Sequence, residues 1–311
     1  MMGLVPDDLL AVRIFISCFG VIGNLTLIIS ISQNKLSRVK TFEFFLLGLA
    51  ASNLEEIIVV NIFDVSILKN SSAMFGTWSC RSLKFLTVFG EINSILFTVL
   101  ISIFRYQKVR DATKRVNLPI YLDNIRSAWL VSGVCLMISS LLSIPILVIN
   151  VQGPATNFTT NKTSCPPDFF LCSKAYCPIQ NRVYKYMFIA FCNLLPMIIV
   201  TITGCLIITV LLSQKKMVSP VVSVSGSRSF FQKTKGPKLN RSTTAVLAAM
   251  GLFQVDWTLY LIFQMVTTNS STESSVWDEV KFFIATSYTS ISPYVYGIGN
   301  NLFSPRTCIK R

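Results

Sequence analysis

The chain of 311 residues contains no histidine. This absence excludes imidazole metal sites and the Ser-His and Cys-His pairs of many hydrolases, and the sequence has no HExxH or GxSxG motif. Charge is also scarce, because 14% of the residues are charged, against about a quarter in soluble domains. With 52% apolar residues, the composition predicts a membrane protein that is not an enzyme and holds no metal or cofactor.

Seven stretches of the chain are long and apolar enough to span a bilayer, which takes about 20 residues. The second, sixth and seventh carry polar residues and are the weaker candidates. We expect a single all-α domain over 1–311, a seven-transmembrane helix bundle with spans at about 9–32, 41–66, 81–105, 126–149, 183–212, 242–268 and 280–303.

The Lys and Arg residues that give the chain its net charge of +14 lie mainly in the segments between these stretches. With an extracellular N-terminus and a cytoplasmic C-terminus, 19 of the 28 Lys and Arg residues fall on the cytoplasmic side, as the positive-inside rule requires. The basic runs at 105–115 and 215–241 then face anionic membrane lipid and a cytoplasmic partner. Because the charge is divided among short loops, we expect no nucleic-acid partner.

Glycosylation motifs agree with this orientation. Four Asn-x-Ser/Thr sequons lie in the expected extracellular loops, at Asn70, Asn157, Asn161 and Asn269. Two further sequons fall in a span and in a cytoplasmic loop, where glycosylation does not occur. We therefore expect a glycoprotein, and the sequence leaves open which of the four sequons are used.

The cysteines agree as well. Cys80 stands at the extracellular start of the third span, and Cys165, Cys172 and Cys177 lie in the second extracellular loop. Four thiols on the oxidising side predict up to two disulfide bonds, and three pairings are open.

Several short motifs follow one another in a fixed order along the chain. In this order and spacing they resemble the landmarks of rhodopsin-like G-protein-coupled receptors, and the resemblance covers the whole chain. It implies a receptor that couples a ligand to a heterotrimeric G protein. The motifs are Gly23-Asn24, Leu49-Ala50-Ala51-Ser52-Asn53-Leu54, Cys80, Phe104-Arg105-Tyr106, Trp129, Pro196, Phe253 with Trp257, and Ser292-Pro293-Tyr294-Val295-Tyr296.

Some positions depart from the usual pattern of that family. Asn53 and Ser292 stand where the family usually has the Asp and Asn that help to hold a sodium ion, which leaves a sodium site open. Phe104 replaces the acid that restrains the neighbouring Arg105. These departures are similar to the vomeronasal type-1 receptor family, and the stretch 104–108 looks like its fish members, the olfactory receptors related to class A.

The vomeronasal resemblance implies a pheromone or odorant as ligand, an inhibitory G protein as partner, and the plasma membrane of chemosensory neurons as location. Bitter taste receptors are similar in size and form the second candidate family. A small transporter predicts inverted repeats and discontinuous helices, and the sequence shows neither. A light receptor requires a retinal-binding lysine where Thr286 stands.

Acidic residues inside the expected spans mark candidate ligand-binding positions. Glu55, Glu91 and Asp256 come from three helices at a similar height, about 21–23 Å from their cytoplasmic ends. We predict that Glu91 binds the polar part of a small ligand; the alternative is a protonated Glu91 that is hydrogen-bonded between helices. Glu55 and Glu56 point about 100° apart, so one of them faces the core directly, and Glu55 is the candidate.

Aromatic side chains flank this level. Phe89, Tyr260 and Tyr288 are candidate walls of the ligand cavity. The alternative for each is a lipid-facing or interfacial position, as is common for aromatic residues of membrane proteins.

The family resemblance also implies an activation switch. Arg105 would hold the inactive state through bonds between helices and then contact the G protein, and without an acidic neighbour it is held less firmly, which predicts basal activity. The alternative for Arg105 is an interfacial arginine that reaches toward water, and for Asp256 a structural role. The other members of the switch are Tyr106, Asp256, Trp257, Pro293 and Tyr296.

Overall fold

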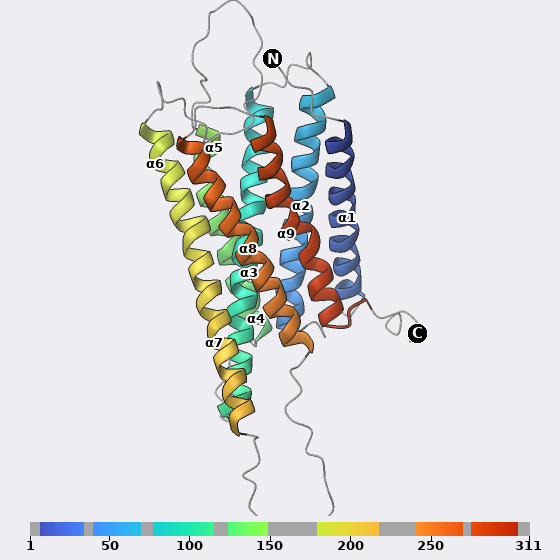
Figure 1. The fold of residues 1–311 in the computed structure, drawn as a ribbon, viewed down its shortest axis with the longest axis vertical. Coiled ribbons are helices and arrows are strands. Elements are labelled where there is room, and N and C mark those ends of the chain that lie inside the picture. Colours follow the sequence, from blue (N-terminus) through green and yellow to red (C-terminus); the bar gives the residue numbers. More distant parts are fainter. Residues whose placement is uncertain are drawn as a thin grey trace, which may run out of the picture.

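The computed structural model describes residues 7–33, 40–69, 77–114, 124–148, 179–217, 241–269 and 275–303. Within these ranges every regular element is a helix, and the helices form seven rods that stand side by side in one bundle (Figure 1). This arrangement confirms the all-α helix bundle expected from the sequence. Helix α1 begins at the top of Figure 1, and this end of the bundle is called the upper end below.

Five of the rods are single helices, and the fourth and fifth rods have several segments. The single helices are α1 (Asp7–Ser32), α2 (Thr41–Lys69), α3 (Thr77–Lys114), α8 (Arg241–Asn269) and α9 (Ser275–Gly299). The fourth rod consists of α4 (Ile125–Ser143) and α5 (Pro145–Val148), and the fifth of α6 (Ile179–Phe188), the π-helix η3 (Ile189–Leu194) and α7 (Leu195–Met217).

Five segments of the described chain are long and apolar enough to cross a membrane, namely Ala11–Ser32, Arg81–Ala112, Ile125–Leu147, Ile179–Ser213 and Arg241–Phe263. Helices α2 and α9 are not among them, in line with their polar content, and α2 carries Glu43, Glu55 and Glu56. The side of the membrane on which the N-terminus lies stays a prediction.

The fourth rod is broken where the sequence predicts one span over 126–149. Proline has no N–H, and its ring clashes with the carbonyl four residues earlier in a regular helix. Helix α4 therefore ends before Pro145, and the N–H of Ile144 makes its last bond, to the carbonyl of Ser140 at 3.0 Å.

The fifth rod contains a π-helical turn that the sequence did not predict. Pro196 lacks the N–H that would bond to the preceding turn. The N–H of Leu195 instead bonds to the carbonyl of Ala190, five residues earlier. Such single turns occur most often at functional positions, and this one buries Cys192 and Asn193.

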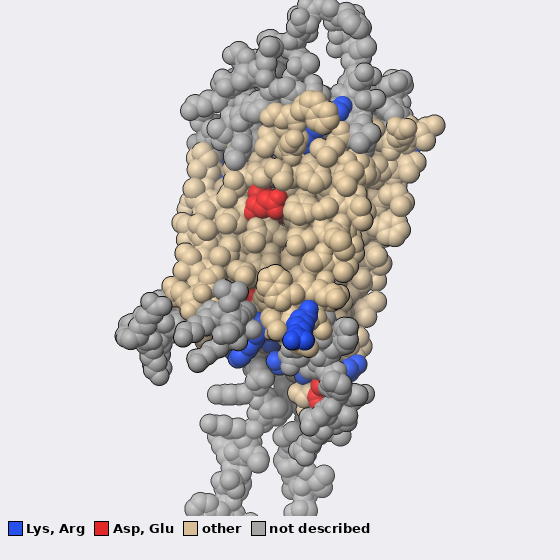
Figure 2. All heavy atoms as spheres, turned by 180° about the vertical axis from the view of Figure 1, so that it is seen from behind, with Lys and Arg blue, Asp and Glu red and all other residues tan. Residues whose placement is uncertain are grey.

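The core lies along the axis of the bundle. Helix α2 packs most extensively on α3, and α8 packs on α9. Apolar side chains from α1, α2, α3, α4, α7, α8 and α9 form one large cluster, to which Phe45, Phe104, Phe253 and Tyr296 contribute the largest fully buried groups. The outward face is apolar too, and Figure 2 shows Lys and Arg side chains at the two ends, most of them at the lower end, with one acidic patch at mid-height.

Candidate functional site

A small cavity lies inside the bundle near its mid-height. Its free volume is about 10 Å³, which is about the room that one water molecule requires. Four helices supply its walls: Glu56 from α2, Ser94 from α3, Asp256, Trp257 and Tyr260 from α8, and Ile284, Tyr288 and Thr289 from α9. Tyr260 and Tyr288, which the sequence predicts as cavity walls, are thus brought together with Asp256 and Trp257, which it predicts as parts of a switch.

Glu56, rather than the neighbouring Glu55, lines this cavity. The side chain of Glu56 is 5% exposed, whereas Glu55 is half-buried and lies outside the lining. Helical spacing explains the difference, because Glu56 stands three residues after the fully buried Asn53 and shares its face.

Glu91 follows Gly90 on α3, at the point where this helix passes Glu56 of α2. Helix α3 approaches α2 here because Gly90 has no side chain. A Cβ atom at Gly90 would lie 3.4 Å from the Cβ of Glu56. Glu91 itself is not in the cavity lining, and Phe89 packs against Phe85 with ring centroids 6.0 Å apart instead of forming a cavity wall.

The hydroxyl groups of the cavity are oriented by bonds to other groups. Ser94 donates to Oδ1 of Asn53 at 2.7 Å, and Thr289 donates to the carbonyl of Thr286 at 3.1 Å. Their hydroxyl hydrogens are therefore engaged outside the cavity, and their lone pairs stay available as acceptors. Oδ2 of Asp256 is buried without a hydrogen-bond partner among the described residues.

Below the cavity, a neutral hydrogen-bond network connects α1, α2, α3 and α9. Nδ2 of Asn53 donates to Oδ1 of Asn24 at 3.4 Å and to the hydroxyl of Ser292 at 3.2 Å. Asn24 donates in turn to the carbonyl of Thr289 at 3.0 Å. No carboxylate takes part, and the amide hydrogens of Asn53 point at the groups that would have to coordinate a cation. These residues do not fit a sodium ion.

We therefore expect the thermal stability of the purified protein to be the same in sodium chloride as in potassium chloride. Asn53→Asp should introduce such a dependence, because a buried carboxylate requires a cation or a proton. The measurement is the unfolding midpoint in detergent at equal ionic strength. A rise of the wild-type midpoint with sodium that Asn53→Ala removes would contradict this prediction.

Arg105 occupies the lower end of the bundle and joins three helices. Its guanidinium donates to the hydroxyl of Ser242 on α8 and, at 3.1 Å, to Oδ1 of Asn300, which follows α9. It also lies 3.6 Å above the ring of Phe42 on α2. Ser242 donates to Asn300 as well. The sequence did not predict these partners, since nothing in a local pattern connects Arg105 with residues that are 63, 137 and 195 positions away.

The remaining members of the predicted switch surround this arginine or lie in the core above it. Phe104 packs its ring against Phe42 and Phe45, with centroids 6.2 and 6.0 Å away. Tyr106 packs at the edge of the core, Pro293 lies inside α9, and Tyr296 is fully buried. An aromatic side chain therefore fills the space in which an acid beside Arg105 would have been placed.

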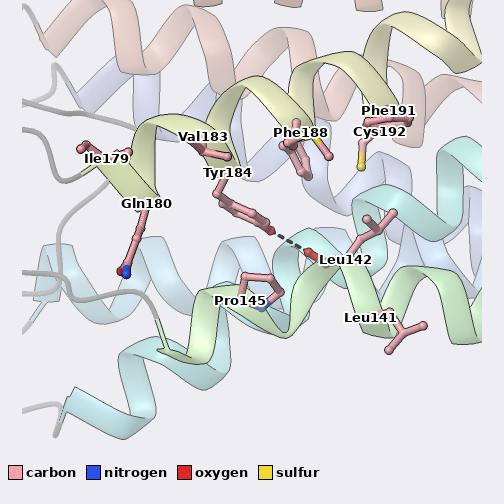
Figure 3. A pocket seen from close by; sticks show the side chains of 11 residues that line it. Leu141, Leu142, Pro145, Ile179, Gln180, Val183, Tyr184, Phe188, Phe191 and Cys192 are labelled. Carbon is pink, nitrogen blue, oxygen red and sulfur yellow. Dashed lines mark hydrogen bonds between the residues drawn. The ribbon is translucent and has the colours of Figure 1, made fainter.

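A larger groove of about 430 Å³ lies on the outside of the bundle, between α4 and the upper part of the fifth rod (Figure 3). Its walls are almost entirely apolar, and they include Leu141, Val183 and Phe191, which are exposed on the outer surface. The hydroxyl of Tyr184 crosses the groove and donates to the carbonyl of Leu142 at 2.8 Å. The groove thus opens toward the surface that faces hydrocarbon in a membrane, away from the acidic cavity.

Several predicted modification sites lie outside the described residues, namely Cys165, Cys172, Cys177, Asn70, Asn157 and Asn161. Cys80 is in the first turn of α3, and Asn269 is the last residue of α8. The predicted disulfides and glycans stay predictions.

The comparison with protein families agrees with the helix bundle. A family model described as 7 transmembrane receptor (rhodopsin family) matches residues 23–296. A comparison with curated proteins finds no match to the chain.

Proposed function

Because the chain belongs to the rhodopsin family of seven-transmembrane receptors, a receptor family and not one of enzymes, we propose that it is a chemosensory receptor. In this proposal a small odorant or pheromone enters from outside the cell, binds in the upper half of the bundle and activates a heterotrimeric G protein of the inhibitory class. The chain is a multi-pass membrane protein, and its proposed location is the plasma membrane of chemosensory neurons.

The arrangement around Arg105 carries the signalling part of this proposal. One arginine at the lower end of α3 is held by neutral groups from α8 and from the residue after α9. A shift of either helix breaks these bonds and exposes the guanidinium to a cytoplasmic partner. Ligand binding would then act as a population shift between two states, driven by the difference in affinity for them.

The orientation of the chain supports the same proposal. The upper end is extracellular if the Lys and Arg residues follow the positive-inside rule, because 19 of the 28 then lie on the cytoplasmic side. Among the described residues, Lys108 and Arg110 follow Arg105 on α3, and Arg241 begins α8 next to Ser242. They are available to anionic lipid and to the G protein.

The test is expression of the full chain in cultured cells with a promiscuous G protein and a panel of small amines, acids and steroids. We expect at least one class of compound to raise the second-messenger signal in a concentration-dependent way. Arg105→Ala should abolish this response while the protein still reaches the cell surface. Uptake of a solute without any G-protein signal would favour a transporter instead.

A further inference from the structure

We propose that the cavity between Glu56 and Asp256 binds the ammonium group of a primary amine. This inference rests on the proposed receptor function, and it names the chemical class of the ligand. It also places the charge-binding carboxyls on α2 and α8, whereas the sequence pointed to Glu91 on α3.

The first argument is the convergence of two buried carboxyls on one space. Glu56 is 5% exposed and Asp256 is 9% exposed, and both line the cavity. No Lys or Arg is among the described residues of the lining. Two carboxylates that share a site of low dielectric cannot both be ionised without a cation between them. An organic cation supplies the missing charge.

The second argument is that neither carboxyl is fully engaged. Glu56 takes part in none of the hydrogen bonds between described residues. Oδ2 of Asp256 is buried without a hydrogen-bond partner among the described residues. Buried polar groups in native proteins are usually satisfied, so these oxygen atoms indicate a donor that is not among the described residues, and we assign it to the ligand.

The hydroxyl groups favour a donor as well. Ser94 and Thr289 direct their hydrogens to Asn53 and to the carbonyl of Thr286, and they present lone pairs to the cavity. A primary ammonium group has three N–H donors, as a lysine side chain does. It can therefore bond to Glu56, to Asp256 and to one hydroxyl at the same time.

The size of the cavity limits which amine fits. A free volume of about 10 Å³ accepts a group of the size of a water molecule. An –NH3⁺ group meets this limit, and a trimethylammonium group does not. The rest of the ligand must extend upward along Trp257 and Tyr260, whose ring centroids lie 5.1 Å apart. The faces of these rings attract a cation or an apolar chain.

The experiment compares matched compounds on the purified full-length receptor and in cells. The amine series is methylamine, butylamine and 2-phenylethylamine, and the matched analogues are 2-phenylethanol, phenylacetic acid and the N,N,N-trimethyl form of 2-phenylethylamine. We expect primary amines alone to raise the unfolding midpoint and to change the G-protein signal. Glu56→Gln and Asp256→Asn should each weaken the amine response at least about tenfold, as expected when a buried charge loses its partner.

Two substitutions of the same type on α2 sharpen the test. Glu43→Gln removes an acid from the lower end of α2 and should leave the amine response unchanged. Glu55→Gln distinguishes the contribution of Glu55 to the amine response from that of the adjacent Glu56. The assignment is overturned if Glu55→Gln has the large effect and Glu56→Gln does not, if the alcohol or the acid acts as strongly as the amine, or if no amine raises the midpoint. It is also overturned if sodium chloride alone produces the shift, since the cavity would then hold an inorganic cation.

Failure of this inference can be distinguished from failure of the proposed function. Basal G-protein activation is measured in the same cells without any compound. Basal activation without an amine effect leaves the receptor proposal intact and overturns the amine assignment. Amine stabilisation that Glu56→Gln removes, without any G-protein signal, supports the site and contradicts the signalling proposal.

Discussion

Gly48→Val should prevent the protein from reaching the cell surface. Gly48 lies on α2 where this helix packs on α3, and a Cβ atom there would overlap the ring of Phe97. The Phe97 side chain is 4% exposed and belongs to the main core cluster, so it has no free space to move into. Overpacking of this kind costs about 1–3 kcal/mol and occasionally more, and it strikes the most extensive helix contact of the bundle.

Gly133→Val on α4 is the matched control. A Cβ atom at Gly133 would have no atom within 4 Å, and both substitutions change the intrinsic helix propensity by the same amount. Surface labelling of intact cells and the unfolding midpoint in detergent provide the measurement. Equal expression and equal midpoints for the two variants would show that α2 and α3 do not pack as described.

The positions of the seven rods could be predicted from the sequence because membrane insertion is decided by local composition. A run of about 20 apolar residues is visible without knowledge of any partner. The break before Pro145 and the π-helical turn before Pro196 could not be placed in this way. Both depend on where the unpaired carbonyl next to a proline finds another donor, and the sequence shows the proline but not that donor.

The kinds of residue that form the candidate site could be predicted from the sequence, but the choice between individual residues and their long-range contacts could not. The expectation that acids would gather inside the bundle follows from the cost of isolated charge in lipid, and Tyr260, Tyr288 and Asp256 do line one cavity. The choice between Glu55 and Glu56 required the rotational position of α2, which its neighbours determine. The contact of Gly48 with Phe97 and the bonds of Arg105 are long-range, and one sequence contains no signal for them.

The cavity and Arg105 are connected by two rigid elements. Helix α8 carries Asp256 at the cavity and Ser242 at the arginine, 14 residues or about 21 Å apart. Helix α9 contributes Tyr288 to the cavity, and Asn300 follows its last residue. A ligand that draws α8 toward α2 at the cavity would tilt both helices and alter the bonds of Arg105. The proposed binding and signalling sites are thus coupled through the helices themselves.

Ser242→Ala and Asn300→Ala should each raise the G-protein signal in the absence of ligand. Each substitution removes one acceptor of the Arg105 guanidinium. Hydrogen bonds to a charged group contribute about 1.5–3 kcal/mol each, and a loss of about 1.4 kcal/mol from the inactive state alone changes the ratio of the two states about tenfold. The two effects should be of similar size, because each substitution also removes the bond between Ser242 and Asn300.

Ser140→Ala is the matched control, because the hydroxyl of Ser140 donates within its own helix to the carbonyl of Leu136 at 2.9 Å and does not contact Arg105. Second-messenger levels are compared at equal surface expression, without added compound. Phe42→Leu tests the third contact, since it removes the aromatic face below the guanidinium while it keeps an apolar side chain. If Asn300→Ala, Ser242→Ala and Ser140→Ala all give the wild-type basal signal, these neutral bonds do not hold the inactive state, and the arginine must be restrained by another part of the chain.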